Sequence, residues 1–517
     1  MQTIHSIKVV TWGTAWAAIF LFYLGCRPAE STPSSTVFYQ IFLRSFADSN
    51  QDGIGDIPGL IEQLPYLDSL GVQGVWLLPI HPSPSYHKYD VSDYYKIDSA
   101  YGTMADFDLL VEELHDRDMR LLIDFVVNHT DDEHPWFQAA LTSPANAFHS
   151  FYVWDDTIAR QENPHHWHRQ PADGPQPNRT GKTFNGFFWK GMPDLNYDQP
   201  AVRDSVKAIA QFWLEKHQVD GLRLDAALHI YPYYHSRQSS NVEKTEAWWQ
   251  EFRAFTDSIA PSSWLVGEVW EGDSTLLPFY NQGLHACFHF DLSKWIVQNI
   301  LNEKDTSRLV VNLQRFYHQQ AAWGVESDAI FLTNHDQDRL RSVLRGSIPQ
   351  SKLAASILLT LPGSPFIYSG EELGMLGQKP DEYIREPFLW GEWAPVAQTS
   401  WLPTRHNLPD STQSLGLQIQ DPHSIFRHYQ RLIDLRTENV LLHSGRLVPF
   451  EKEVPSTLLV YQRVRAGRSC LVVHNLSGKP VEWAYSASEL SWASYSAVLA
   501  PGFIGPYQTL IYGLDLQ

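Results

Sequence analysis

The chain has 517 residues, of which 43% are hydrophobic and 19% charged, and its formal net charge is -19. This composition is that of a globular protein long enough to bury a substantial core, as one large domain or as two to three domains. An acidic chain without runs of Lys or Arg is a poor match for nucleic acid or for an anionic membrane surface. Its three cysteines are Cys26, Cys287 and Cys470. They show no zinc-binding spacing and exclude a framework of two disulfides. One bridge between Cys287 and Cys470 stays open, although the apolar run around Cys287 favours a buried free thiol.

Residues 1–26 are typical of an export signal. An apolar stretch over residues 9–24 ends at a Gly-Cys pair, which resembles a bacterial lipoprotein signal whose cysteine, here Cys26, is lipidated. Because Tyr23 stands where a Leu is more usual, an ordinary signal peptide and an uncleaved anchor are alternatives. All three predict export, either lipid-anchored at the periplasmic or outer face of a bacterial membrane or secreted. Residues 27–35 then form a polar tether, and no other segment is long and apolar enough to span a bilayer.

From residue 36 onward, strand and helix patterns alternate, which indicates a parallel sheet with helical crossovers. Short apolar runs predict eight strands, at Val37–Phe42, Val75–Ile80 and Leu121–Val127 and near Gly221, Trp264, Ala286, Ala329 and Pro365. Helical spacing of apolar residues predicts helices over Leu60–Leu70, Phe107–Leu114 and Ala201–Lys216. Eight strands are the count of a (β/α)8 TIM barrel.

The alternation stops over residues 130–197, which are polar, aromatic and rich in Pro and Gly, without a helical period. A stretch of this length is too long for a loop in a compact domain, so we interpret it as a subdomain inserted after strand 3. The barrel then comprises residues 36–129 and 198–440. Short alternating segments over residues 441–517 predict a C-terminal all-β domain, a β-sandwich. The predicted fold class is therefore α/β.

Three of the predicted strands lead into acidic residues: Asp225, Glu268 and Asp336. The C-terminal ends of barrel strands face one shared pocket. Three carboxylates there cannot all keep ordinary pKa values, so one can act as an acid while another stays ionised. Arg223 lies two residues before Asp225, on the same face of its strand, and would hold that carboxylate ionised. The bulk of Val269 and Trp270 would desolvate Glu268 and raise its pKa.

The strand ends also carry motifs that resemble those of the α-amylase family of glycoside hydrolases, family 13. Four motifs occur in the family's order, as Asp124–His129, Gly221–His229, Gly267–Trp270 and Asn334–Asp336. Met192–Asn196 (Met-Pro-Asp-Leu-Asn) resembles the motif near the end of the family's inserted domain, in the group of α-amylases and maltodextrin hydrolases. Tyr368–Gly374 resembles the last barrel motif. The resemblance covers residues 36 to about 517.

The resemblance implies a retaining, endo-type hydrolase of α-1,4-glucosidic bonds in starch, maltodextrins or related α-glucans. Asp225 would be the nucleophile, Glu268 the acid/base and Asp336 the transition-state stabiliser, with the first two carboxyls about 5–5.5 Å apart. The residues expected to bind the sugar are Tyr89, Asp90, His129, Arg223, His229, His335 and Arg385.

Two positions after the nucleophile bear on specificity. In the α-amylase family, a small residue at the position of Ala226 goes with α-1,4 cleavage, whereas a Val at that position goes with α-1,6 cleavage. Leu228 stands where amylases of that family usually have a Lys that contacts sugar on the leaving-group side. The strength of that subsite is therefore in doubt.

The segment from Asp48 to Asp56 alternates oxygen ligands around glycines, a chemistry that suits Ca²⁺. It begins like an EF-hand loop, but position twelve is Gly59 rather than Glu, so the EF-hand interpretation fails. Relatives of the α-amylase family, which this chain resembles, have a calcium loop after the first strand. Here the calcium ligands would be Asp48, Asn50, Asp52, Asp56 and the Ile54 carbonyl. An Asx-rich turn without an ion is the alternative. Many amylases of the family that this chain resembles also hold a second calcium, which here would lie near Asn128.

Other functions fit the same scaffold. A cyclomaltodextrinase, an α-glucosidase or a transglycosylase would differ in the depth of the cleft, which the inserted segment sets. A non-catalytic, anchored glucan-binding or transporter-associated protein typically lacks part of the acidic trio, whereas all three acids are present here. We expect an α-glucan as the partner, and a monomer.

Overall fold

The computed structural model describes residues 35–154, 164–169, 183–231, 238–325, 328–483, 490–494 and 502–513. The predicted export segment, with Cys26, and all but the last residue of the tether lie outside these ranges. Residues 33–517 belong to one compact unit. Within the described ranges, no helix is long and apolar enough to cross a lipid bilayer.

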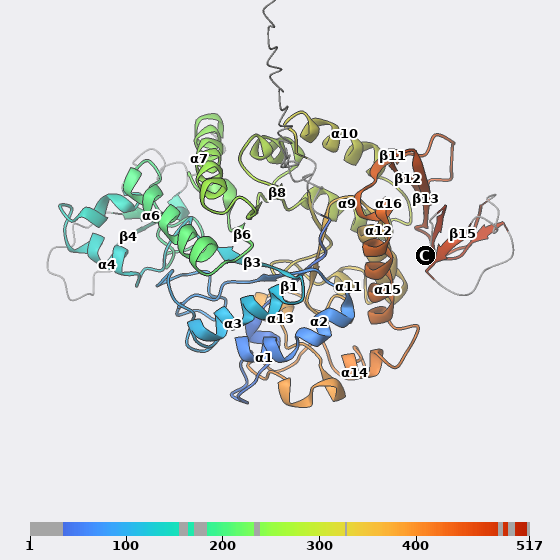
Figure 1. Cartoon of the computed structure of the whole chain (residues 1–517), viewed down its shortest axis with the longest axis horizontal. Helices are drawn as coiled ribbons and strands as arrows, with labels where there is room; N and C mark the ends of the chain where they lie inside the picture. The colour runs from blue at the N-terminus through green and yellow to red at the C-terminus, as the bar shows by residue number, and fades with distance from the viewer. Residues whose placement is uncertain are drawn as a thin grey trace, which may run out of the picture. The chain divides into compact units, whose positions relative to one another are not determined.

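Eight parallel strands form the central sheet, in the order β8-β7-β6-β3-β2-β1-β10-β9 (Figure 1). The strands are β1 (Phe38–Ile41), β2 (Gly74–Leu77), β3 (Arg120–Phe125), β6 (Gly221–Leu224), β7 (Trp264–Gly267), β8 (Ala286–Cys287), β9 (Ala329–Phe331) and β10 (Ser364–Tyr368). Phe288, directly after β8, forms a parallel bridge with Ala329 of β9. The next residue, His289, donates its N–H to the Ala329 carbonyl at 3.0 Å. The sheet therefore closes into the predicted barrel, and all eight predicted strands are confirmed.

Aromatic rings fill the inside of the barrel. Phe38 stacks on Phe366 with ring centroids 4.8 Å apart, and both belong to one buried cluster with Trp76 and Phe288. A side chain at Gly74 would place a Cβ 2.4 Å from the Phe38 ring. The glycine at the start of β2 therefore makes room for the ring that β1 buries.

The helices surround this sheet (Figure 1). Their bounds are α1 (Ile57–Glu62), α2 (Leu64–Leu70), α3 (Met104–His115), α6 (Pro200–Gln211), α7 (Gln238–Ile259), α8 (Asp273–Leu276), α9 (Phe290–Leu301), α10 (Leu309–Ala321), α11 (Leu340–Val343), α12 (Ile348–Thr360), α13 (Asp381–Ile384), α14 (Leu415–Gln418), α15 (Ile425–Glu438) and α16 (Val440–Ser444). A π turn at Phe212–Lys216 continues α6 to the predicted end. The single helix predicted over Leu60–Leu70 is wrong, because α1 and α2 meet at Gln63. Pro65, in the first turn of α2, has no N–H to continue α1.

The segment predicted as an insertion has secondary structure that its sequence did not reveal. It contains α4 (Pro135–Thr142) and a two-stranded antiparallel sheet of β4 (Trp167–Arg169) and β5 (Thr183–Asn185). The expectation of no helical period was therefore wrong at α4, whose first position is a proline capped by His134. An isolated bridge from His129 to Asp194 ties this segment to the end of β3, and a second bridge, from Tyr152 to Leu195, lies within the segment. The proposed domain boundaries stay predictions.

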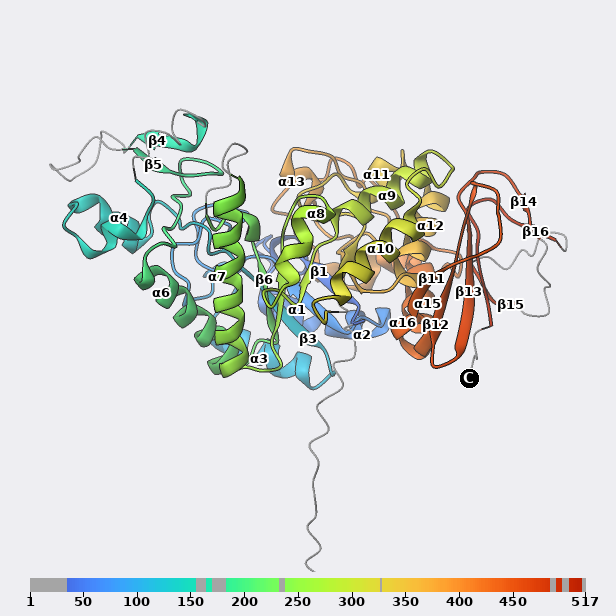
Figure 2. The same cartoon turned by 90° about the horizontal axis from the view of Figure 1, so that it is seen from above.

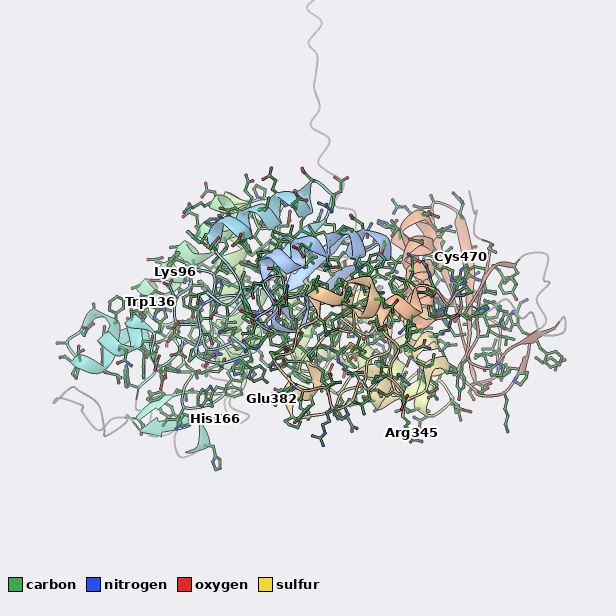
Figure 3. All side chains as sticks on the ribbon, turned by 90° about the horizontal axis from the view of Figure 1, so that it is seen from below. Lys96, Trp136, His166, Arg345, Glu382 and Cys470 are labelled. Carbon is green, nitrogen blue, oxygen red and sulfur yellow. The ribbon has the colours of Figure 1, made fainter. Side chains whose placement is uncertain are left out.

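The chain ends in an antiparallel sheet, as predicted (Figure 2). Its five strands follow the order β11-β12-β13-β17-β15, and β14 pairs separately with β16. The bounds are β11 (Arg446–Pro449), β12 (Leu458–Arg465), β13 (Arg468–Asn475), β14 (Val481–Glu482), β15 (Leu490–Ala493), β16 (Phe503–Ile504) and β17 (Thr509–Tyr512). Cys470 lies on β13 (Figure 3) and Cys287 on β8, and both are buried free thiols, so the structure does not contain the alternative bridge.

Candidate active site

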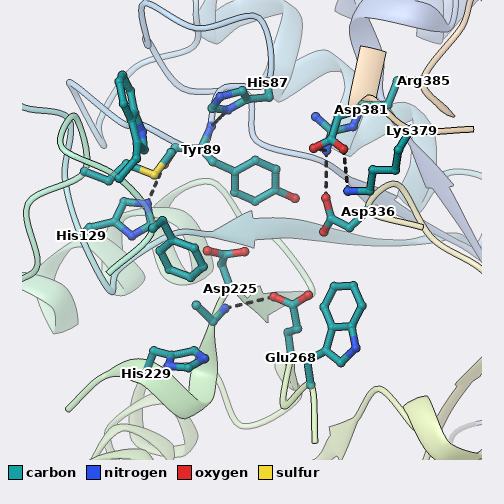
Figure 4. Close-up of a pocket in the computed structure, with 15 residues that line it drawn as sticks. His87, Tyr89, His129, Asp225, His229, Glu268, Asp336, Lys379, Asp381 and Arg385 are labelled. Atoms are coloured by element: carbon teal, nitrogen blue, oxygen red, sulfur yellow. Dashed lines mark hydrogen bonds and ion pairs between the residues drawn. The ribbon is translucent and has the colours of Figure 1, made fainter. Parts of the chain in front are cut away.

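A pocket of about 500 Å³ opens at the C-terminal ends of the barrel strands (Figure 4). It is lined by His87, Tyr89, His129, Phe188, Trp189, Met192, Asp225, Ala226, His229, Glu268, Trp270, Asp336, Lys379, Asp381 and Arg385. The three strand-end acids therefore meet in one pocket. Four of the predicted sugar-binding residues also line it: Tyr89, His129, His229 and Arg385. The other three, Asp90, Arg223 and His335, lie buried behind the wall.

Arg223 on β6 binds three carboxylates with one buried guanidinium. Its Nη1 donates to Asp124 Oδ1 at 2.7 Å and to Asp225 Oδ1 at 2.6 Å. Its Nη2 lies 2.9 Å from Glu268 Oε2. The acids come from the ends of β3, β6 and β7, which are neighbours in the sheet. Parallel strands in register thus bring three carboxyl groups to one cation.

Burial and neighbouring charges determine the pKa of Glu268. Burial raises the pKa of Glu268 to about 8, and the charges of Asp225 and Asp336 add to the rise, while Arg223 opposes it. Glu268 Oε2 also accepts the Ala226 N–H at 3.2 Å (Figure 4). Because Oε2 accepts from two donors, the proton of the neutral acid belongs on Oε1. Glu268 is therefore a carboxylic acid at neutral pH.

The turn after Asp225 fixes the positions of Asp225 and Glu268 relative to each other. Ala226 has φ +47° and ψ +39°, in the left-handed region that costs a non-glycine residue roughly 1 kcal/mol. The turn is held by the N–H of Ala227, which donates to the Glu268 carbonyl at 3.0 Å. On β7, a Cβ at Gly267 would lie 2.3 Å from Leu284 Cδ1. The backbone at this glycine therefore packs closely against Leu284, which positions Glu268.

A chain of hydrogen bonds behind the wall fixes the ring of Tyr89. Gln40 Nε2 donates to His335 Nδ1 at 2.6 Å, which leaves the histidine proton on Nε2, 2.5 Å from the Tyr89 hydroxyl. The hydroxyl donates onward to Asp124 Oδ2 at 3.0 Å. Burial and the charges of Arg385 and Arg223 lower the pKa of His335 well below its ordinary value. His335 is thus neutral and holds Tyr89 in place.

Two of these supports, Gln40 and Asp124, were not among the predicted site residues. Asp124 opens the first family motif, and its side chain follows the inward alternation of β3, so a signal was present. Burial raises the pKa of Asp124 to about 7, against the opposing charge of Arg223. Gln40 lies in the middle of an apolar strand, and its polar side chain in a fully buried run was the available signal.

Asp336 is held from two sides. Arg385 Nη2 lies 2.8 Å from its Oδ1, and His335 Nε2 lies 3.2 Å from its Oδ2. The Asp336 side chain keeps 26% of its surface exposed, toward the pocket. Lys379 and Asp381, which pair at 2.5 Å and also line the pocket, were not predicted. Asp336 is thus an oriented carboxylate that can still reach a ligand.

Two predicted histidines lie on the other wall, where His129 is buried and His229 is half-buried. His129 donates from Nε2 to the Tyr89 carbonyl at 3.1 Å and accepts the Asn128 amide at Nδ1. His229 stacks on Phe187 with ring centroids 4.1 Å apart, and burial lowers its pKa to about 4. Both rings are therefore neutral polar surfaces. Asp90, behind them, accepts hydrogen bonds from two serine hydroxyls of its own loop.

Three aromatic side chains form an open rim that was not predicted as part of the site, although Trp270 was expected to desolvate Glu268. Phe188, Trp189 and Trp270 keep 46%, 45% and 50% of their surface exposed and line the pocket. Exposed aromatic faces suit the apolar faces of sugar rings. Leu228, in contrast, is 2% exposed and packs in the core. It adds no contact to the pocket.

The loop from Asp48 to Asp56 has the donor chemistry of a calcium site. Asp48 accepts the N–H groups of Gln51 and Gly53, both at 2.7 Å, so the Asx-turn alternative is also present. Asp48 and Asp56 are buried. Burial raises the pKa of Asp56, and the charge of Asp48 adds to the rise. No group of three or more His, Cys, Asp or Glu in the described part of the chain is arranged to hold a metal. Calcium loops also use amide and main-chain oxygens, so the residues present fit the ion.

Between the two pocket residues His87 and Tyr89, Lys88 faces the interior. Its Nζ lies 2.7 Å from Asp98 Oδ2 and donates to the Ser83 carbonyl at 2.9 Å. Its backbone has φ +66°, a left-handed conformation. This buried ion pair therefore anchors the loop that carries His87 and Tyr89.

Replacing Lys88 with Met should lower the free energy of unfolding by roughly 3 kcal/mol, because Asp98 is left buried and unpaired. Lys96 supplies the matched control, since its pair with Asp93 lies on the same loop but the lysine is 69% exposed (Figure 3). Lys96→Met should leave the free energy of unfolding almost unchanged, because its ion pair is exposed to solvent. Urea denaturation measures both, and equal effects of the two variants would contradict the anchoring role.

Known proteins resemble this chain over most of its length. The family profile described as "Alpha amylase, catalytic domain" matches residues 40–445. Alpha-amylase 3 of Dictyoglomus thermophilum is 42% identical over 448 residues, 86% of this chain and 85% of that protein. A 4-alpha-glucanotransferase of Thermotoga maritima is 34% identical over 452 residues, 86% of this chain and 96% of that protein. The crystal structure of an alpha-amylase from H. orenii superposes with a TM-score of 0.82 at 36% identity, over 93% of this chain and 99% of that one. With the barrel and the trio of acids, these matches show that the chain belongs to the α-amylase family and is a glycoside hydrolase.

Proposed function

We propose that this enzyme hydrolyses α-1,4-glucosidic bonds within starch, maltodextrins or related α-glucans, with retention of configuration. The observation that carries the proposal is the shared Arg223 guanidinium. It binds Asp225 as an anion while burial holds the pKa of the adjacent Glu268 at about 8. Retaining hydrolysis needs this combination of an ionised carboxylate and a carboxylic acid, about 5–5.5 Å apart.

The first step forms a covalent bond to Asp225. Its Oδ1 is bound to Arg223, so Oδ2 attacks the anomeric carbon. As the bond to the leaving oxygen breaks, that oxygen takes the proton from Glu268 Oε1. In the second step, Glu268 accepts a proton from water, the water oxygen attacks the anomeric carbon, and the ester to Asp225 breaks. Asp336, oriented by Arg385 and His335, accepts hydrogen bonds from the sugar hydroxyls and stabilises the positive charge that develops on the ring.

The bond preference rests on Ala226 and on the named relatives. Ala226 lines the pocket directly after the nucleophile and leaves room beside it. The relative named alpha-amylase is 42% identical, which favours starch-like chains. Relatives named 4-alpha-glucanotransferase and oligo-1,6-glucosidase, at 34% and 29% identity, make transfer or α-1,6 hydrolysis the second candidate. Products from soluble starch, β-cyclodextrin, pullulan and isomaltose separate these activities. We expect new α-anomeric ends from starch and no glucose from isomaltose.

Removing the acid should matter only when the leaving group needs a proton. Glu268→Gln should lower kcat/KM on maltodextrin by about 10²–10⁴-fold. For the wild type, kcat/KM should fall as the pH rises through about 8, because the deprotonated Glu268 has no proton to donate. With α-maltosyl fluoride, whose fluoride leaves without a proton, the first step should keep most of its rate in the variant and show no such alkaline fall.

Asp225→Asn is the matched control, since it should abolish cleavage of both substrates. Near-normal activity of Glu268→Gln on maltodextrin would contradict the assignment of the acid. The same alkaline fall with the fluoride would also contradict it, because the titrating group would then not be the proton donor.

We also propose that Ca²⁺ binds the first loop, with Asp48, Asn50, Asp52, Asp56 and the Ile54 carbonyl as ligands. Two buried carboxylates in one loop support a cation there, which would stabilise the folded state by mass action. EGTA should therefore lower the Tm of the wild type by several degrees. It should have no effect on Asp52→Ala, because that variant lacks one of the proposed ligands. Asp52 is exposed, so its removal spares the fold. An unchanged wild-type Tm in EGTA, or an equal shift in the variant, would refute the site.

Export and lipidation at Cys26 are proposals that rest on the sequence of residues 1–26 alone. A monomeric state is likewise proposed.

A further inference from the structure

Three aromatic rings, those of Phe42, Tyr86 and Trp401, pack together beside the residues that hold Asp336. Trp401 stacks on Tyr86, with ring centroids 5.5 Å apart and an interplanar angle of 21°. The buried ring of Phe42 meets both of them edge-on, at 5.9 Å from Trp401 and 6.3 Å from Tyr86. These three rings, the aromatic cluster, do not line the pocket. The cluster can therefore act on a bound substrate only through other residues.

The aromatic cluster supports the guanidinium of Arg385. The guanidinium carbon lies 5.8 Å from the ring centres of both Phe42 and Tyr86, within the range in which a cation is attracted to an aromatic face. The Arg385 Nη2 pairs with Asp336 Oδ1 at 2.8 Å, and its Nε donates to the His335 carbonyl at 2.9 Å. The guanidinium is therefore held both by two rings and by the carboxylate that it orients.

Trp401 also reaches Arg385 through a hydrogen-bonded serine. The indole Nε1 of Trp401 donates to Ser45 Oγ at 2.8 Å, and the Ser45 hydroxyl donates to the Arg385 carbonyl at 2.5 Å. Because Ser45 is buried, leaving any of these groups unpaired is costly. Trp401 thus fixes the backbone of Arg385 as well as the Tyr86 ring that contacts its side chain.

Contacts with the loop after β1 hold Trp401 itself in place. The N–H of its neighbour Ser400 donates to the Gly53 carbonyl at 2.9 Å, and the Gly53 N–H donates to Asp48 Oδ2 at 2.7 Å. The guanidinium of Arg44 lies 5.2 Å from the centre of the Trp401 ring. In the sheet, β10 lies between β1 and β9. A residue of the segment after β10 thus links the loop after β1 to the acid that follows β9.

We propose that Trp401 is a positioning residue for the hydrolysis, because it fixes the Arg385 guanidinium that orients Asp336. Trp401 acts through the ring of Tyr86 and the hydroxyl of Ser45. This inference rests on the proposed function. The Asp336 side chain is partly exposed, so its orientation depends on its partners. Its carboxylate contributes most when positive charge develops on the sugar ring in the transition state. Loss of Trp401 therefore lowers kcat and leaves KM nearly unchanged.

A double-mutant cycle with Asp336 tests the positioning role. Trp401→Leu removes the ring and its N–H, and it should lower kcat on maltodextrin by about 10–100-fold. The factor should be the same with α-maltosyl fluoride, because the charge on the sugar ring develops with either leaving group. In an Asp336→Asn background, Trp401→Leu should lower kcat by less than about twofold, because no anion remains for Arg385 to orient. A loss of folded enzyme would instead lower kcat equally in both backgrounds.

Two milder variants and one control complete the test. Trp401→Phe and Ser45→Ala each break the hydrogen bond between the indole and the hydroxyl, but both keep an aromatic ring beside Tyr86. Each should lower kcat by a smaller factor than Trp401→Leu, and the two together should lower it no further than one alone. Trp393, which is 43% exposed on the same segment after β10, supplies the matched control. Trp393→Leu should leave kcat unchanged. Tm values check folding, and Trp401→Phe replaces Trp401→Leu in the cycle if the latter does not fold.

The outcomes separate the positioning role from the function on which it rests. An equal fall of kcat in both Asp336 backgrounds, or an unchanged kcat in the Trp401 and Ser45 variants, would overturn the positioning role while the proposed function stands. A higher KM with an unchanged kcat would also overturn it, because Trp401 would then support substrate binding alone. If the wild type cleaves neither maltodextrin nor the fluoride, the proposed function itself fails.

Discussion

Arg223 has no exposed surface, and its guanidinium is bound to Asp124, Asp225 and Glu268 at once. Burying one charge is costly, and burying four groups that titrate is tolerable only if they neutralise each other. One cation among three acids cannot keep all three ionised. Burial therefore leaves a proton on Glu268, whereas Asp225 pairs with the guanidinium at 2.6 Å. The division into acid and nucleophile thus follows from one shared partner.

The rest of the fold keeps those four groups in register. Parallel pairing of β3, β6 and β7 sets their heights, and the closed barrel prevents the strands from sliding. Glycine positions let bulky rings and Leu284 approach, as at Gly74 and Gly267. The strained backbone at Ala226 then bends the chain, so that the Ala226 N–H donates to Glu268 Oε2. Stability and chemistry therefore depend on the same contacts.

Much of this architecture was predictable, because strand-forming runs and terminal acids are local patterns. All eight strands and the pocket of Asp225, Glu268 and Asp336 follow from them. A local sequence pattern does not show whether a side chain faces the pocket or forms hydrogen bonds behind the residues that line it. His335 was expected to bind sugar, whereas Gln40 and Tyr89 occupy its nitrogens.

The division of roles requires that Glu268 be protonated and Asp225 ionised in the resting enzyme at neutral pH. Neutron crystallography of the deuterated protein at pH 7 distinguishes the two protonation states. We expect a deuteron on Glu268 Oε1, none on either oxygen of Asp225, and a fully deuterated Arg223 guanidinium between them. A deuteron on Asp225 with Glu268 bare would instead show that the roles of acid and nucleophile are reversed.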